Sequence, residues 1–235
     1  MTGWPSIQDY NKALLSDKNN LRLSGLEHVA LETNSLGLLN VLSGGFAYVY
    51  QLSASSGKKA LRLFHSVSQE RLPYLQEAYT LLSTLRNDGD GLSKHLVEAR
   101  WIPFCLRVPV GDRDWVPGVL MDWVQAPTLG AWLEQHHKNS AALQRLRYGL
   151  KKLQETLEAR SLIHGDIQTG NLAVQDDGFV LLLDYDGLQK AGPEYRFWEQ
   201  GHIHFQHPDA FSSAGMGAPA GSSAPADLSR IRAVD

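Results

Sequence analysis

The chain has 235 residues, of which 43% are hydrophobic and 20% charged, a composition typical of a globular protein with a buried core. Its formal net charge of -3 argues against nucleic-acid binding, because proteins that bind nucleic acid usually carry a basic face. The single cysteine, Cys105, excludes an intrachain disulfide and a cysteine-based metal site, and we expect it to be a small buried hydrophobe.

Three short apolar segments follow an N-terminal extension, which we place at residues 1–30 and which contains a helical patch at residues 7–15. The second and third segments are rich in aromatic and β-branched residues, which predicts two strands joined as a hairpin. The three segments are residues 36–42, 46–52 and 59–64. The turn of the hairpin is residues 53–57.

The next stretch, residues 68–85, changes to a helical period. Its large apolar side chains recur at Leu72, Leu75, Tyr79, Leu82 and Leu85. The polar, glycine-containing residues 87–91 end this helix. Two further strands are predicted at residues 96–103 and 115–123, so the order is strand, strand, strand, helix, strand, strand.

The chain becomes helical from Thr128, whose hydroxyl can cap a short helix that runs to His137. A long amphipathic helix is predicted at residues 141–160, with one face formed by Leu143, Leu146, Leu150, Leu153 and Leu157. Two short strands are then predicted at residues 172–174 and 179–183. Residues 212–226 are almost all Ser, Ala, Gly and Pro, which is typical of a linker.

The loop after the long helix contains the strongest chemical signal. Asp166 and Asn171 lie five residues apart, where both side chains can point into one cleft. Phosphoryl transfer uses this combination, because a carboxylate orients the attacking hydroxyl and a neutral oxygen ligand helps to hold Mg²⁺. Asp184 ends the next apolar strand and can bind the same metal. Each of these residues alone is common in turns, so the hypothesis depends on the ordered set.

This ordered set resembles the catalytic loop and the metal-binding motif of protein kinases, through His164-Gly165-Asp166 with Asn171 and then Asp184-Tyr185-Asp186. The resemblance implies that Asp166 is the catalytic base and that Asn171 and Asp184 bind Mg²⁺. It also implies that His164 holds the loop by hydrogen bonds and does not titrate in the reaction.

Two downstream stretches, residues 199–202 and 205–208, resemble the end of an activation segment in bacterial Ser/Thr protein-kinase-like proteins. In that family the Asp-Tyr-Asp-Gly and Gln-His-Pro elements occur together, and here the second is Gln206-His207-Pro208. The resemblance extends over residues 36–208 and therefore implies that most of the chain has the kinase-like fold.

The N-terminal half agrees with this resemblance. Gly44, Gly45 and Ala47 resemble a divergent glycine-rich loop whose backbone N–H groups approach phosphates, although two adjacent glycines also fit a plain hairpin turn. Arg62 stands at the position of the phosphate-binding lysine in the strand of residues 60–64. Glu77, on the following helix, resembles the glutamate that pairs with that cation, and a solvated pair of surface charges is the alternative.

Residues 119–124 resemble the hinge between two kinase lobes, which implies that adenine makes backbone hydrogen bonds near Asp122, Trp123 and Val124. The expected fold is α+β and two-lobed, with an antiparallel-sheet N-lobe that has one helix and a mostly helical C-lobe. The expected limits are residues 31–122 for the N-lobe, 123–210 for the C-lobe and 211–235 for the linker and tail.

Three features depart from the kinase pattern. Arg62 replaces lysine, and it presents a planar fork where lysine presents a point charge. Gly165 replaces the arginine that control by a phosphorylated activation loop needs, so we expect no such control. The chain ends soon after Pro208, so we expect a truncated or reduced C-lobe with an altered surface for peptides.

The sequence therefore predicts ATP-dependent phosphoryl transfer to protein Ser/Thr hydroxyls, with Asp166 as the base and Mg-ATP held between the lobes. A pseudokinase that binds nucleotide or a partner without transfer is one alternative, and a phosphotransferase for small hydroxylated molecules is another. The expected partner is a protein substrate or a regulatory protein. We expect a cytoplasmic location without membrane contact, because no apolar run spans a bilayer and residues 1–10 lack the pattern of a secretory signal.

Overall fold

The computed structural model describes residues 3–23, 26, 29–110 and 113–192. It combines helices with a six-stranded antiparallel sheet, which confirms the predicted α+β class. The chain divides into two compact units, of which unit 1 consists of Met1–Gln76 and Glu98–Trp123 and unit 2 of Glu77–Val97 and Val124–Asp235. The motifs expected at residues 199–208 and the linker expected at 211–235 lie outside the described residues.

Residues 77–97, which we expected in the N-lobe, belong to unit 2. Their last residues contact residues 180–182: His95 Nδ1 lies 2.7 Å from the carbonyl oxygen of Val180, and Leu96 forms a parallel bridge with Leu182. The division after Trp123 lies next to the boundary expected after residue 122.

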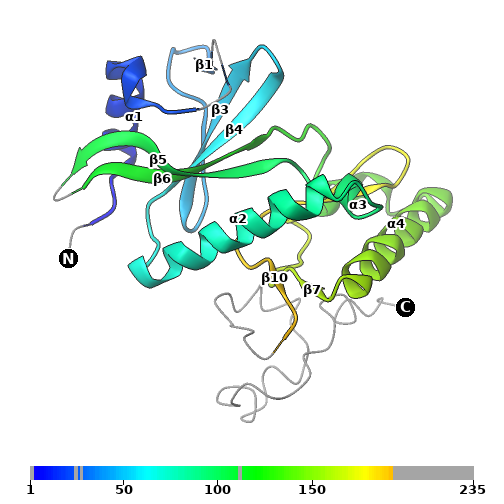
Figure 1. The fold of residues 1–235 in the computed structure, drawn as a ribbon. Helices are drawn as coiled ribbons and strands as arrows, with labels where there is room; N and C mark the ends of the chain where they lie inside the picture. Colours follow the sequence, from blue (N-terminus) through cyan, green and yellow to red (C-terminus); the bar gives the residue numbers. More distant parts are fainter. Residues whose placement is uncertain (1–2, 24–25, 27–28, 111–112, 193–235) are drawn as a thin grey trace, which may run out of the picture. The chain divides into compact units, whose positions relative to one another are not determined.

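The sheet of unit 1 contains all the strands predicted in this half of the chain. Neighbouring strands pair in the order β1-β3-β4-β6-β5, and β2 also pairs with β3 (Figure 1). The strands are β1 (Ala30–Leu31), β2 (Val41–Ser43), β3 (Ala47–Ala54), β4 (Gly57–Phe64), β5 (Ala99–Val110) and β6 (Arg113–Asp122). The apolar run at residues 36–42 joins the sheet only at its end, in β2.

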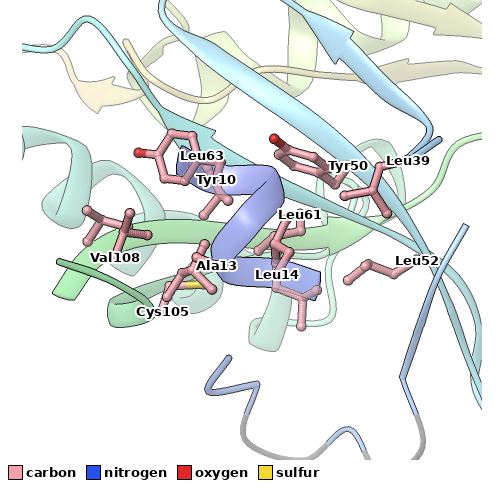
Figure 2. Close-up of a cluster of buried hydrophobic side chains, with 13 residues drawn as sticks. Tyr10, Ala13, Leu14, Leu39, Tyr50, Leu52, Leu61, Leu63, Cys105 and Val108 are labelled. Carbon is pink, nitrogen blue, oxygen red and sulfur yellow. The ribbon is translucent and has the colours of Figure 1, made fainter. Parts of the chain in front are cut away.

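One face of this sheet forms the core of unit 1. Leu61 of β4 lies opposite Tyr50 of β3 and Leu120 of β6, and directly paired residues share a face. Helix α1 (Ile7–Ser16), which begins with a capping box, packs on this face through its buried side chains (Figure 2). The core consists of Tyr10, Ala13, Leu14, Leu39, Tyr50, Leu52, Leu61, Leu63, Cys105, Leu106, Val108, Val116 and Leu120.

The N-terminal extension is therefore part of the packed core of unit 1, beginning with the helix predicted at residues 7–15. Cys105 is fully buried in the same core, as predicted, and burial raises the pKa of its thiol to about 12. A short 3-10 turn, η1 (Lys18–Asn20), follows α1, and a second one, η2 (Gln69–Arg71), precedes the next helix.

That next helix, α2 (Leu72–Asn87), confirms the helix predicted at residues 68–85. Its buried face consists of Leu75, Ala78, Tyr79, Leu82 and Leu85. Four of these five residues were predicted from the helical period, and the fifth is the small residue Ala78.

The described part of unit 2 contains two further helices and two small sheets. Thr128 caps the first helix, because its hydroxyl accepts the N–H of Ala131 at 3.4 Å, and Asn139 caps the second through the N–H of Ala142 at 3.1 Å. The elements are η3 (Ser93–His95), α3 (Leu129–His136), α4 (Ser140–Ala159), β7 (Leu162–Ile163), β8 (Leu172–Val174), β9 (Val180–Leu182) and β10 (Gln189–Lys190). β8 pairs with β9 and β7 with β10, both antiparallel. Among the described residues, no helix has the length and apolar character needed to cross a membrane.

Helix α4 buries three of the five leucines of the predicted face. Leu146, Leu153 and Leu157 are buried as expected, but Ala142 and Gly149 complete the buried face, and Leu143 and Leu150 lie at its edges. A Cβ on Gly149 would collide with the backbone of Gly178 in the turn between β8 and β9. The helix therefore packs against that turn through its backbone, and this contact rotates the buried face away from Leu143 and Leu150.

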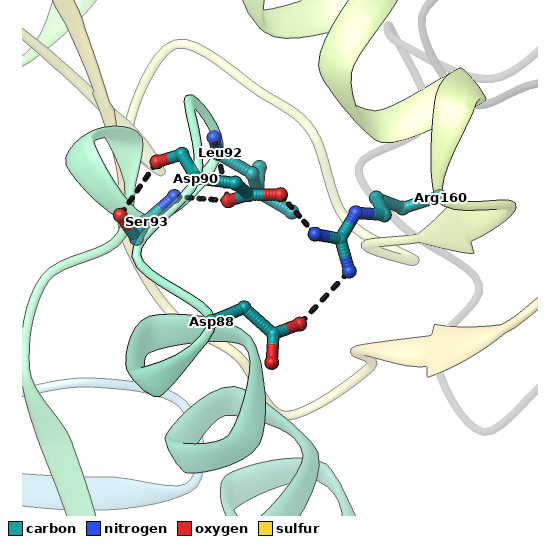
Figure 3. A network of polar contacts seen from close by, with 5 residues as sticks. All are labelled: Asp88, Asp90, Leu92, Ser93 and Arg160. Atoms are coloured by element: carbon teal, nitrogen blue, oxygen red, sulfur yellow. Dashed lines mark hydrogen bonds and ion pairs between the residues drawn. The ribbon is translucent and has the colours of Figure 1, made fainter.

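A polar network joins the end of α4 to the segment after α2 (Figure 3). Arg160 donates to the carboxylate of Asp88 at 2.8 Å and also to the carboxylate of Asp90. Asp90 accepts the N–H groups of Leu92 and Ser93 at 3.0 and 3.1 Å. The network fixes the segment that leads to His95 beside the end of α4.

Candidate functional site

The loop between β7 and β8 brings Asp166 and Asn171 into direct contact. Nδ2 of Asn171 donates to Oδ2 of Asp166 at 2.8 Å and to the Asp166 carbonyl oxygen at 2.9 Å. Nε2 of Gln168 donates to the same carboxylate oxygen at 2.7 Å. The loop itself therefore fixes the direction of the Asp166 carboxylate.

The end of β9 is attached to this loop through Leu183. Its N–H donates to the carbonyl oxygen of Asn171 at 2.8 Å, and its carbonyl oxygen accepts from Nε2 of His164 at 2.9 Å. His164 is fully buried, and its predicted role of holding the loop by hydrogen bonds is confirmed. Because Asp184 follows Leu183 directly, these bonds tie the backbone before Asp184 to the loop that carries Asp166 and Asn171.

Asp184 has a left-handed backbone, with φ of 53°. Among the described residues, only Ser161 shares this property without being glycine. Such a backbone costs of order 1–3 kcal/mol, and it persists only where the surroundings determine it. The residues on the C-terminal side of Asp184 supply this constraint.

Tyr185 is fully buried, and its hydroxyl makes two hydrogen bonds. The hydroxyl accepts the N–H of Val97 at 2.7 Å and donates to the carbonyl oxygen of Leu182 at 2.5 Å. Burial raises the pKa of Tyr185, so this hydroxyl stays protonated and remains a donor. Asp186 is also buried, and its Oδ1 accepts from the hydroxyl of Tyr79 at 2.9 Å.

The two loops also touch through their backbones, at Gly165 and Gly187. Gly165 has φ of 88°, and a Cβ there would lie 3.2 Å from the Cα atom and from the carbonyl oxygen of Gly187. A Cβ on Gly187 would lie 2.7 Å from the carbonyl oxygen of His164. The close approach therefore gives a structural reason for glycine at both positions.

The donor atoms of this region fit Mg²⁺, which prefers oxygen ligands. Nδ2 of Asn171 makes both of its bonds to Asp166, so Oδ1 is the amide atom that can face a cation. Asp184 adds a half-buried carboxylate. In the described part of the chain, no three or more His, Cys, Asp or Glu side chains gather as a metal cluster. This is compatible with Mg²⁺, which usually takes one or two carboxylates together with water and substrate phosphates.

In unit 1, the glycine turn between β2 and β3 is attached to the end of β4. The N–H of Gly44 donates to the carbonyl oxygen of Ala47 at 2.9 Å and closes the turn. Nε2 of His65 lies 3.1 Å from the carbonyl oxygen of Gly44, and the N–H of His65 donates to the carbonyl oxygen of Phe46 at 2.9 Å.

Local packing does not require glycine in this turn. A Cβ on Gly45 would meet no atom within 4 Å, and a Cβ on Gly44 would meet only the carbonyl oxygen of Ala47, at 3.4 Å. Neither glycine has a positive φ. Glycine here leaves the surface of the turn open, which suits the approach of an anion to the backbone.

Arg62 lies on the sheet face away from the core of unit 1. It pairs with Val49 of β3, and Ala60 pairs with Met121 of β6, so these four residues share one face. Val49, Arg62 and Met121 are partly exposed, whereas Ala60 is buried. The guanidinium carbon of Arg62 lies 5.5 Å from the ring centroid of Phe64, which belongs to the same face.

Glu77 lies on the exposed side of α2, next to the buried residues Ala78 and Tyr79. Arg62 belongs to unit 1 and Glu77 to unit 2, and their pairing stays a prediction.

The predicted hinge already uses two of its backbone donors within the sheet. The N–H of Asp122 donates to the carbonyl oxygen of Glu98 at 2.9 Å. The N–H of Trp123 donates to the carbonyl oxygen of Lys58 in β4 at 3.2 Å. The Asp122 carboxylate pairs with Lys59. A base bound here would therefore use the carbonyl groups of Asp122 and Trp123 or the N–H of Val124.

Two residues that contact the site were not predicted from the sequence. Gln168 binds the Asp166 carboxylate, and Tyr79 binds Asp186. The helical period correctly placed Tyr79 on a buried face, but periodicity carries no information about the partner of its hydroxyl. For Gln168 the available signal was its position two residues after Asp166.

No protein-family model matches the chain, and no curated protein matches it either.

Proposed function

We propose that the chain transfers the γ-phosphoryl group of ATP to Ser/Thr hydroxyls of a protein, with Asp166 as the base and Mg²⁺ on Asn171 and Asp184. The observation that supports this proposal best is the double attachment of Leu183 to Asn171 and His164, because it ties the backbone before Asp184 to the loop that carries Asp166 and Asn171. One carboxylate base and two oxygen ligands close together are what phosphoryl transfer requires.

In the proposed step, the acceptor hydroxyl oxygen attacks the γ-phosphorus of ATP, and the bond to the bridging oxygen breaks so that ADP leaves. Asp166 accepts the hydroxyl proton, and Asn171 and Gln168 orient its carboxylate before the acceptor arrives. Bound Mg²⁺ supplies neutralisation of the phosphate charge.

On the side of unit 1, we assign the nucleotide to the sheet face that carries Arg62 and to the glycine turn. Val49 and Met121, which are partly exposed on this face, offer an apolar surface on which a flat base can lie. Arg62, on the same face, stays charged at physiological pH and presents parallel donors that match phosphate oxygens. The open surface at Gly45 suits the same phosphates.

A two-lobed protein-kinase-like fold is the architecture that we propose for the whole chain. The order of elements in the described residues supports it, because α2 follows β4 and precedes β5, as expected for a sheet with one inserted helix. The pair of helices α3 and α4, followed by the Asp166 loop, supports a C-lobe that carries the catalytic residues.

Nucleotide or partner binding without transfer is the second candidate function. The observation that favours it is the closed glycine turn, in which the Gly44 N–H already donates to Ala47 and is not directed at a phosphate. Arg62 in place of lysine points the same way, because its planar fork changes how a phosphate is positioned.

Thermal unfolding with ATP, with and without Mg²⁺, tests whether the site binds nucleotide. ATP at about 100 times its dissociation constant should add roughly 2.7 kcal/mol to the free energy of unfolding, which raises the melting temperature by about 5–10 °C for a chain of this size. We expect the Mg²⁺-dependent part of this rise to vanish in Asp184→Ala. Asp176→Ala, which removes an exposed aspartate from the turn between β8 and β9, is the matched control and should keep it.

Transfer of labelled γ-phosphate to the chain itself or to a Ser/Thr-rich acceptor protein separates the two candidates. Asp166→Ala should lower the transfer rate by about 10²–10⁴-fold and leave the ATP-dependent thermal shift nearly unchanged. Mg-ATP binding with no transfer by the wild type would favour the second candidate. An Asp184→Ala variant that binds Mg-ATP like the wild type would refute the proposed metal site.

A further inference from the structure

The contact between Tyr79 and Asp186 joins helix α2 to the segment that carries the proposed metal ligand. The two residues are separated by 107 positions in the chain, and both belong to unit 2. The Tyr79 hydroxyl donates to Oδ1 of Asp186 at 2.9 Å, and the two side chains are only 2% and 6% exposed. The bond is therefore shielded from water on both sides.

A buried carboxylate is an expensive partner for a core tyrosine. A tyrosine hydroxyl that only needs a partner can use any carbonyl oxygen, as Tyr185 does with Leu182. Burying a carboxylate instead costs free energy unless its hydrogen bonds are well made. The packing of α2 alone therefore does not explain why Tyr79 pairs with a carboxylate. The pairing is better explained by its effect on the neighbouring backbone.

What it positions is the strained backbone of Asp184. Tyr185 is held at its hydroxyl by Val97 and Leu182, and Asp186 is held by Tyr79, so both residues after Asp184 are fixed by side-chain bonds. On the other side, Leu183 is fixed by backbone bonds. Loosening Asp186 would let the φ of 53° at Asp184 relax toward a more favourable value.

We propose that Tyr79 is a positioning residue that acts through Asp186 to hold the Asp184 carboxylate in its metal-binding position and thereby sets the affinity for Mg²⁺. This inference rests on the proposed function of Asp184. It also gives α2 a direct connection to the metal ligand that depends on Tyr79 and not on Glu77, which lies on the exposed side of the helix.

The test is a Mg²⁺ titration of ATP binding, followed by thermal shift, in the wild type and in Tyr79→Phe. The variant keeps the aromatic ring and removes only the hydroxyl. We expect the Mg²⁺ concentration for half-maximal shift to rise about 10-fold, the low end of the effect of partners that orient metal ligands. ATP binding without Mg²⁺ should not change, and saturating Mg²⁺ should restore the full shift.

Tyr148→Phe is the matched control, because it makes the same chemical change on an exposed tyrosine of α4, and its Mg²⁺ midpoint should equal that of the wild type. Asp186→Ala removes the acceptor of the same hydrogen bond and should raise the midpoint as well. Combining it with Tyr79→Phe should add little, because both changes loosen one contact.

The outcomes separate this inference from the proposed function. A wild type without any Mg²⁺-dependent shift overturns both. A wild type that shows the shift, with an unchanged midpoint in Tyr79→Phe and Asp186→Ala, overturns only the role of Tyr79. A loss in Tyr79→Phe that saturating Mg²⁺ does not restore also overturns it, because a general loss of structure gives that result.

Discussion

Replacing Gly165 by alanine should destabilise the fold well beyond the usual effect of one methyl group. The φ of 88° at Gly165 is one that residues with a side chain rarely adopt, and holding alanine there costs roughly 1–3 kcal/mol. The new Cβ would also lie 3.2 Å from backbone atoms of Gly187, which cannot rotate away as a side chain can, and such overpacking costs about 1–3 kcal/mol. We therefore expect a loss of at least about 2 kcal/mol, or a fall in melting temperature of about 4–8 °C.

Gly170→Ala is the control for this prediction, because it lies in the same loop. Its φ is not positive, and a Cβ there would meet no atom within 4 Å, so the free energy of unfolding should change by no more than about 0.5 kcal/mol. Urea denaturation followed by circular dichroism measures both variants. A loss in Gly165→Ala that lies within about 0.5 kcal/mol of the control would falsify the close approach of the two loops.

Two further predictions concern residues outside the proposed chemistry. Ser161 follows α4 with φ of 49°, so Ser161→Gly should raise the free energy of unfolding by about 0.5–1 kcal/mol in urea denaturation, and a lower value would contradict the left-handed backbone there. Burial lowers the pKa of His95 below its usual 6.5, an effect that outweighs its bond to Val180, so the unfolded chain binds this proton more readily than the folded one. The stability that neutral His95 contributes is complete above pH 6.5 and is lost as the pH falls through its folded pKa. His95→Gln should therefore show a shallower loss of stability between about pH 7 and 5, and an equal slope in both proteins would contradict this assignment.

Local patterns were sufficient to predict most elements of the fold. The hairpin of β3 and β4 and the helix α2 follow from aromatic and β-branched runs and from a helical period, because each buries a face that repeats in the sequence. Thr128 and Asn139 cap helices through their own side chains, and only the first was predicted. Elements whose buried face is made of large apolar side chains are the ones that such patterns detect.

The packing of α4 depends on a contact that a hydrophobic pattern does not detect. Its predicted face was chosen by counting leucines, but the helix contacts the turn at Gly178 through Gly149, where the absence of a side chain matters. A glycine that permits a close backbone approach contributes nothing to a hydrophobic pattern. Leu143 and Leu150 were therefore placed on the buried face, although they lie at its edges.

The grouping of residues 77–97 with unit 2 could not be predicted for a related reason. It depends on contacts between residues far apart in the chain, such as the bond between the N–H of Val97 and the hydroxyl of Tyr185. Chain order placed these residues between strands of the unit 1 sheet. A single sequence carries no signal for the partner of a buried backbone N–H.

The sequence predicted which residue types form the candidate site. The structure adds that one of them, Asp184, has a backbone conformation that costs free energy. An aspartate at a strand end is ordinary. An aspartate with φ of 53° is costly to hold, and here Leu183 on one side is held by the loop between β7 and β8 and Asp186 on the other side by α2. Glycine would adopt the same backbone without strain. Natural sequences break a local rule of this kind mostly at functional sites, where the side chain itself is needed. The strain at Asp184 is thus an argument for a role of its carboxylate that is independent of any resemblance to kinases.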